Sequence, residues 1–203
     1  MEITKIVITG GPCAGKTAAM SHIRDHFSKE GYTVLFVPET ASELISGGVA
    51  PWTCGTNEDY QVCQMRMQLF KEEIFLAGGS TMPTQRLLLV CDRGAMDNRA
   101  YMDDGEFARV LNKLGLEANA LRDSYDAVFH LVTAAKGLPQ FYTLENNAAR
   151  IETVEEATAL DDRILAAWAG HPHFRLIENS PDFERKISHL LAEIAMFLAE
   201  KNS

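Results

Sequence analysis

The sequence has few cysteines, a deficit of basic residues and no long apolar run. Its 203 residues include 19 lysines and arginines against 28 acidic residues, which gives a net charge of −9. This net negative charge argues against DNA, RNA or acidic lipid as partners, because a protein binds these negatively charged partners through a basic surface. The four cysteines show no C-x-x-C spacing, so we expect free thiols and neither a disulfide framework nor a zinc site.

The sequence also lacks the features of a membrane segment or a secretory signal. No apolar run approaches the length that spans a bilayer, and Met1 to Lys5 lead directly into an apolar strand. We therefore expect a cytoplasmic protein without a membrane span. The length suits one domain over residues 1–203, large enough to bury a substantial core.

The most informative motif is the glycine-rich segment GGPCAGKT at residues 10–17. It fits the pattern G-x-x-x-x-G-K-[ST], follows the apolar run 6–8 and opens an alanine-rich segment without proline, as strand, loop and helix require. Its glycines let backbone N–H groups turn inward around phosphates, and the positive end of the next helix attracts anions. The alternative is a turn that only closes a corner between strand and helix. We predict phosphate binding by Gly10, Gly11, Pro12, Cys13, Ala14, Gly15, Lys16 and Thr17.

Three residues of this motif have individual expectations. Lys16 should reach the β- and γ-phosphates of ATP or GTP, and the Thr17 hydroxyl should bind Mg²⁺, which prefers oxygen ligands. Cys13 has two interpretations. It is either a thiol whose oxidation abolishes binding or simply a small residue that fits the loop.

Apolar strands alternate with helical segments along the chain. We predict strands at 6–8, 33–37, 87–91, 127–132 and 174–177, and long helices at 16–29, 57–77 and from 181 or 182 to 200. Nearly continuous apolar strands separated by helices indicate an α/β fold with a parallel sheet covered on both faces. Ligands then bind at the carboxyl ends of the strands, and the irregular segments 46–56 and 133–147 are interpreted as loops over that site.

Acidic and basic side chains follow two of these strands. Asp92, directly after the third strand, is our first candidate for holding Mg²⁺, and a helix cap is its alternative role. Glu39, after the second strand, is a candidate for accepting the proton of a substrate hydroxyl, or else caps the helix that begins near Thr40. Arg93 either stabilises charge on the transferred phosphate or forms a structural ion pair.

Two further segments are candidates for contacts with substrates. The segment 146–153 lies where a mobile lid would close, and Arg150 would then neutralise charge on the γ-phosphate, unless it pairs with Glu152 or Glu156. On the long helix, three polar residues either line a substrate cavity or form a solvated face. They are Gln64, Arg66 and Gln68.

Five segments together resemble a known family. They are VITGGPCAGKT, VPETA, CDRGAMDNRAYM, YDAVFHLVTAA and NNAARIETVEEA. The chain is similar over most of its length to the P-loop ATPase-like domain of the NadR ribosylnicotinamide kinase and of TRPL translocation defect proteins, and most similar to the latter. The resemblance implies a nucleoside- or nucleotide-kinase-like P-loop fold with sheet order 2-3-1-4-5 and a lid at about 133–152. It also implies that Glu39, Asp92, Arg93 and Arg150 correspond to the family's acidic residue, Asp-Arg pair and lid arginine.

These observations predict a Mg²⁺-dependent P-loop enzyme that uses ATP or GTP. The expected reaction transfers the γ-phosphoryl group to a small, nucleoside-like or other hydroxyl-bearing acceptor. The alternative is a nucleotide-binding switch that acts through a protein partner. The second carboxylate, Glu39, favours the kinase, while the acceptor, the choice of base and the oligomeric state stay open.

Overall fold

The computed structural model describes residues 1–137 and 153–201 of the chain. The strands are β1 (Glu2–Thr9), β2 (Thr33–Val37), β3 (Arg86–Asp92), β4 (Ala127–Leu131) and β5 (Phe174–Ile177). The helices are α1 (Lys16–Lys29), α2 (Thr40–Ser46), α3 (Asn57–Ser80), α4 (Asp104–Leu114), α5 (Ala118–Arg122), α6 (Val154–Ala167) and α7 (Phe183–Lys201), with the 3₁₀ helix η1 (Ala95–Tyr101). All five predicted strands are present, so the expected alternation is confirmed.

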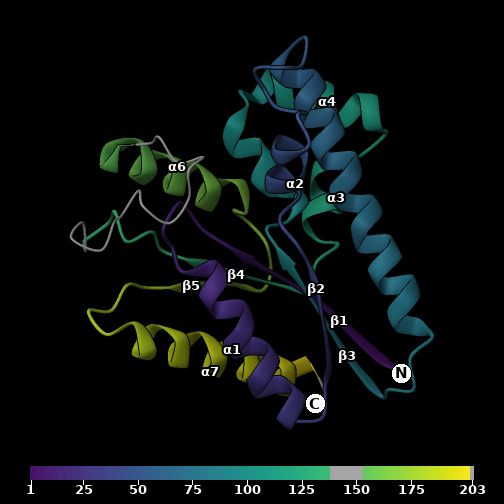
Figure 1. Ribbon diagram of the computed structural model, residues 1–203, viewed down its shortest axis with the longest axis vertical. Helices are drawn as coiled ribbons and strands as arrows, with labels where there is room; N and C mark the ends of the chain where they lie inside the picture. Colours follow the sequence, from purple (N-terminus) through teal and green to yellow (C-terminus); the bar gives the residue numbers. More distant parts are fainter. Residues whose placement is uncertain (138–152, 202–203) are drawn as a thin grey trace.

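The strands form one parallel sheet in the order β2-β3-β1-β4-β5, as the resemblance implies. In the centre of the sheet, Ile6 of β1 is in register with Val90 of β3 and with Ala127 of β4. Figure 1 shows α1 and α7 on one side of the sheet and α3, α4 and α6 on the other. The carboxyl ends of β2, β3 and β1 therefore lie next to one another, with the ends of β4 and β5 beyond them.

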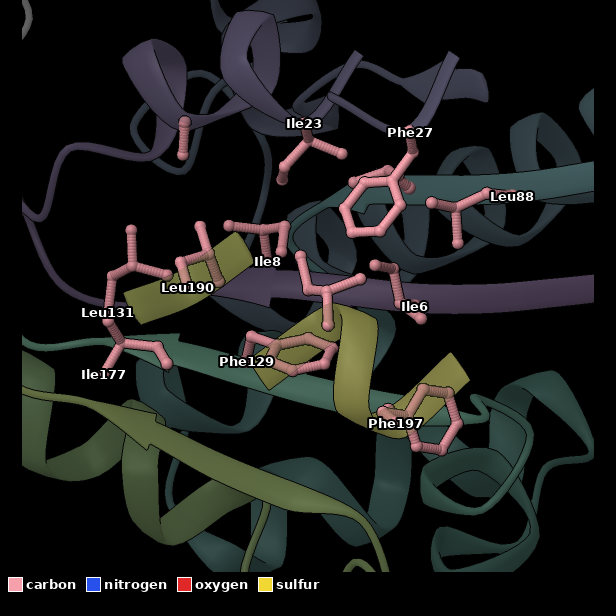
Figure 2. Close-up of a cluster of buried hydrophobic side chains, with 14 of the residues drawn as sticks. Ile6, Ile8, Ile23, Phe27, Leu88, Phe129, Leu131, Ile177, Leu190 and Phe197 are labelled. Atoms are coloured by element: carbon pink, nitrogen blue, oxygen red, sulfur yellow. The ribbon is translucent and has the colours of Figure 1, made fainter. Parts of the chain in front are cut away.

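Side chains of β1 alternate between two hydrophobic cores. Ile6 and Ile8 point toward α1 and α7, where they pack with Ile23, Phe27 and Leu190, as Figure 2 shows. All these side chains are at most 1% exposed. Truncation of a buried leucine such as Leu190 to alanine typically costs about 2–5 kcal/mol, so this core fixes α7 against the sheet.

The second core lies on the opposite face of the sheet. Val7 points to this face and packs in one cluster with Met65 of α3, Ile164 of α6 and Trp168, which follows α6. Trp168 is fully buried, and its indole ring meets the Tyr125 ring edge-on at a centroid distance of 5.3 Å. This core therefore fixes α3 and α6, both of which reach the carboxyl end of the sheet.

Two predicted features differ from the structure. The helix expected to end at Ala77 continues through Gly78 and Gly79 to Ser80. At Gly79 an added Cβ would lie 2.6 Å from a methyl group of Leu87, so this glycine allows close packing of helix on sheet and does not end the helix. Residues 95–122 form η1, α4 and α5, which the apolar pattern did not predict.

No described helix is both long and apolar enough to cross a membrane.

Candidate functional site

The glycine-rich loop turns sharply between β1 and α1. Gly10 has φ +135°, and an added Cβ there would lie 2.0 Å from the carbonyl oxygen of Leu131. Gly15 has φ +90°, and an added Cβ would lie 2.7 Å from the ring of Phe183. Both positions therefore require glycine for conformation and for space. Cys13 also has a positive φ of 55°, which is uncommon for a residue with a side chain.

Side chains from distant parts of the chain hold the loop in this shape. Asp161 of α6 accepts a hydrogen bond from the Gly11 N–H through Oδ1 at 2.7 Å. Lys186 of α7 donates to the Ala14 carbonyl at 2.9 Å, and the Thr133 hydroxyl donates to the carbonyl of Pro12. The loop is thus held from both sides of its turn, which favours a preorganised anion site.

Lys16 lies across this loop. Its Nζ donates to the carbonyl oxygens of Gly10 at 2.9 Å and Gly11 at 3.1 Å, and the side chain is partly exposed. Burial and the nearby Arg93 guanidinium lower the pKa of Lys16 to about 8. The carboxylates of Asp92, Glu39 and Asp97 offset part of this lowering, and a triphosphate would favour the charged ammonium further.

Asp92 and Thr17 are the candidate ligands for a divalent cation. Asp92 Oδ1 is buried and has no hydrogen-bond partner among the described residues, and burial raises the pKa of this carboxyl. Thr17 and Asp92 line one cavity, which is described below. Within the described part of the chain, no group of three His, Cys, Asp or Glu side chains could hold a metal ion. These two oxygen donors fit Mg²⁺, because this ion usually keeps waters and takes its other ligands from substrate phosphates.

Glu39 and Arg93 form an ion pair between the ends of β2 and β3. Arg93 Nε lies 2.5 Å from Glu39 Oε1, and Arg93 Nη1 donates to the Gly10 carbonyl at 3.1 Å. The Ser42 hydroxyl donates to the other Glu39 oxygen at 2.6 Å. Burial alone would raise the pKa of Glu39, but the charges of Arg93 and Lys16 lower it to about 2. Arg93 is therefore both an ion-pair partner and a neighbour of the phosphate loop.

Gln68 of α3 connects the two turns that carry this ion pair. Its amide oxygen accepts a 2.6 Å hydrogen bond from the Thr40 hydroxyl, and its amide nitrogen donates to the Arg93 carbonyl at 3.3 Å. Arg93 has a positive φ of 70°, so this buried amide helps to hold a strained backbone. Three polar residues of α3 were candidates for lining a substrate cavity. Gln64 lines the cavity described below, whereas Gln68 is buried and Arg66 is exposed to solvent.

Asp97 is a site residue that the sequence did not indicate. It is 2% exposed and accepts hydrogen bonds from the Thr9 hydroxyl at 2.7 Å, the Trp168 indole N–H at 2.6 Å and the Gly94 N–H at 3.2 Å. It connects the end of β1 to the turn that follows Asp92. Gly94 is a local partner, but Thr9 and Trp168 lie 88 and 71 residues away, so the local pattern gave no sign of these two contacts.

One cavity of about 1050 Å³ brings most of these groups together. The phosphate loop lies in the middle, because β1 is the central strand of the sheet. Toward β2, the cavity is lined by Glu39, Ala41, Ser42, Ile45, Pro51, Trp52, Asn57, Tyr60, Gln61, Gln64, Asp92, Arg93, Asp97 and Tyr101. Toward β5, it is lined by Ala134, Asn179, Ser180, Pro181, Phe183 and Lys186. The segment 46–56 thus contributes to the cavity, as expected of a loop over the site.

A family model described as an AAA domain matches residues 5–186, which include the glycine-rich loop and all the residues named above as lining the cavity. The chain belongs to this AAA domain family. No curated protein matches the chain. For this AAA domain, a P-loop fold and nucleotide binding are therefore supported by family and by geometry alike.

The AAA domain also contains expected site elements beyond the described residues. Arg150 and most of the proposed lid, residues 138–152, lie outside them. The described start of that segment reaches the phosphate loop through Thr133, and Lys136 pairs with Asp161 at 2.7 Å. Asn179, which follows β5, donates to the carbonyls of Thr133 and Lys136 at 2.7 and 2.8 Å.

Proposed function

We propose that this AAA domain is a Mg²⁺-dependent kinase that transfers the γ-phosphoryl group of ATP or GTP to a small, nucleoside-like or other hydroxyl-bearing acceptor. The observation that carries the proposal is the meeting of Lys16, Asp92 and the Glu39–Arg93 pair in one cavity. Donor binding needs the phosphate loop, a cation and a carboxylate for the metal. Glu39 is a second carboxylate beyond that requirement, and its position suits the acceptor.

The donor would be held by residues of the phosphate loop. Backbone N–H groups of residues 13–17 face the phosphates, and the Lys16 ammonium interacts with the β- and γ-phosphates. Thr17 and Asp92 would hold Mg²⁺, which when bound neutralises charge on the phosphate oxygens. We further propose that Arg150 adds positive charge at the γ-phosphate.

The acceptor would be oriented by Glu39. Two of the about four lone-pair sites of this carboxylate are used by Arg93 and Ser42, which leaves capacity to accept a hydrogen bond from a substrate hydroxyl. The acceptor oxygen forms a bond to the γ-phosphorus, the bond from that phosphorus to the bridging oxygen of the β-phosphate breaks, and the hydroxyl proton leaves through Glu39 to solvent. A carboxylate with a pKa of about 2 is a weak base, so we expect this proton to move late in the transfer.

A transfer assay tests this proposal. The protein is incubated with γ-labelled ATP or GTP, Mg²⁺ and a panel of nucleosides, nucleotides, ribosylnicotinamide and small sugars, and label is followed into new products. We expect product with the unmodified chain and loss of product in Glu39→Gln and Arg150→Ala while triphosphate binding remains. Glu43→Gln is the matched control, because Glu43 lies one turn further along α2 and pairs with Lys71 outside the cavity.

The alternative, a switch that acts through a protein partner, predicts a different result. If no acceptor takes label but bound nucleotide changes hydrogen exchange in residues 133–152, the switch replaces the kinase.

We also propose that residues 1–203 form one nucleotide-binding domain, that the protein is cytoplasmic without nucleic-acid partners, and that its narrower relationship is to the NadR and TRPL translocation defect group.

A further inference from the structure

The part of the cavity toward β2, where an acceptor would bind, is negatively charged. We call this part, with the lining residues given above from Glu39 to Tyr101, the acceptor half. Its charged side chains among the described residues are three carboxylates, Glu39, Asp92 and Asp97, and one guanidinium, Arg93. One positive and three negative charges leave a formal charge of −2 before any nucleotide binds.

The cations that line the cavity in the described part of the chain are already engaged. Arg93 pairs with Glu39 and donates to the Gly10 carbonyl. Lys186 donates to three oxygen atoms, those of Ala14, Val132 and the Asn179 side chain, at 2.7–2.9 Å. The remaining cation, Lys16, lies on the phosphate loop and serves the donor. A second phosphate group in the acceptor half would therefore find no uncommitted cation among these residues.

Neutral polar groups in the acceptor half are, in contrast, available. The Gln64 amide lines the cavity and makes no hydrogen bond to another described residue, and neither does the Tyr60 hydroxyl. Asn57 and Gln61, in contrast, are already hydrogen-bonded. The Gln61 amide donates to the Asn57 side chain, and Asn57 donates to the Tyr101 carbonyl. Uncharged donors and acceptors next to aromatic rings suit a polar compound without negative charge.

We propose that the acceptor half takes an unphosphorylated hydroxyl compound and rejects phosphorylated ones. This inference rests on the proposed kinase function and selects within its range of acceptors. A phosphorylated acceptor would bring its charge next to Asp97 and the donor triphosphate, and like charges in such proximity are strongly disfavoured. The enzyme is then a kinase for compounds at the level of nucleosides or free sugars, and not for their monophosphates.

Matched acceptor pairs that differ by one phosphate provide the test. The pairs are each nucleoside with its 5′-monophosphate and ribose with ribose 5-phosphate, assayed with labelled donor and Mg²⁺. We expect kcat/KM to be at least about 100-fold higher for the unphosphorylated member of the pair that reacts best. Equal or faster transfer to a phosphorylated member would overturn the inference and leave the kinase proposal intact.

Binding of the same pairs distinguishes the two proposals when no transfer occurs. Calorimetry is carried out on the protein loaded with Mg²⁺ and a nonhydrolysable ATP analogue. Preferential binding of unphosphorylated members would support the charge selection and count against the kinase reaction. Tighter binding of monophosphates, or binding of neither member, would overturn the inference.

Gln64→Arg adds an uncommitted guanidinium to the acceptor half. It should raise the relative kcat/KM, or the relative affinity, for phosphorylated members by about tenfold. Cys63→Arg is the control, because it adds the same charge one residue away on the exposed face of α3, outside the cavity. An equal change in both variants, or no change in Gln64→Arg, would contradict the role assigned to local charge.

Discussion

Replacing Lys186 by methionine removes a cation that connects three parts of the site. Lys186 is 5% exposed, and its ammonium donates to Ala14 of the phosphate loop, to Val132 after β4 and to the Asn179 side chain after β5. Methionine keeps most of the apolar stem but cannot donate. The variant therefore leaves buried acceptor oxygens without this partner and frees one side of the phosphate loop.

The expected loss of stability follows from two opposing terms. Burial lowers the pKa of Lys186 from 10.5 to about 8, which corresponds to a cost of about 3 kcal/mol for the buried ammonium. Each hydrogen bond from a charged donor contributes about 1.5–3 kcal/mol, so three of them exceed that cost. We expect Lys186→Met to lower the free energy of unfolding by about 3 kcal/mol. For a chain of this size that is a decrease in Tm of about 6–12 °C.

Urea unfolding and calorimetric titration with ATP and GTP measure both consequences. Triphosphate affinity should fall as well, because the variant lacks the hydrogen bond from Lys186 to the Ala14 carbonyl that holds the phosphate loop in its binding conformation. Arg185→Met is the control, since Arg185 is the exposed neighbour of Lys186 on α7 and should change neither quantity by more than about 0.5 kcal/mol. A Lys186→Met variant as stable and as tight in binding as the control would refute the reasoning.

Three further predictions concern the charged groups of the site. Lys16→Ala should weaken triphosphate binding far more than it lowers stability, and unchanged affinity for ATP and GTP by calorimetry would remove the phosphate-loop assignment. Asp92→Asn should keep nucleotide binding but lose turnover, because the shape is preserved and the charge that organises Mg²⁺ is not; full activity in the transfer assay would move that role to Glu39. The pKa of Glu39 is lowered from 4.5 to about 2, so its ion pair contributes stability above pH 4.5 that is lost as the pH falls from 4.5 toward 2. Urea unfolding over that range should show a weaker acid dependence in Glu39→Gln than in the unmodified chain, and identical slopes would argue against the ion pair.

The convergence of Glu39, Asp92 and Arg93 could be predicted because it follows from topology. Asp92 is the last residue of β3, Arg93 follows it, and Glu39 lies two residues beyond β2, and parallel strands place their carboxyl ends at one edge of the sheet. The strand order that makes β2, β3 and β1 neighbours came from the family resemblance, and the structure confirms it. The helix α4 is also predictable from sequence, because a capping box at Asp103 and Glu106 and a terminal Gly115 mark its two ends.

Asp161 and Lys186 could not be predicted in this way. They lie 150 and 172 residues from the loop atoms that they bind, and each is a charged residue on a helix that otherwise shows an ordinary solvated face. A charged residue on such a helix is usually exposed. Its burial depends on how α6 and α7 pack against the sheet, which the local pattern does not specify.

Gln64 and Gln68 show the same limit within a single helix. They lie four residues apart on one face of α3, so helical periodicity assigns them equivalent positions. The turns after β2 and β3 cover Gln68, which bonds to Thr40 and to the Arg93 carbonyl, but they leave Gln64 open to the cavity. Gln68 is thereby committed to holding the strained Arg93 backbone, whereas the Gln64 amide faces the cavity without a hydrogen bond to another described residue. Sequence reasoning could place both side chains near the site, but only the packing of the strand-end turns over α3 determines that Gln68 is buried and that Gln64 lines the cavity.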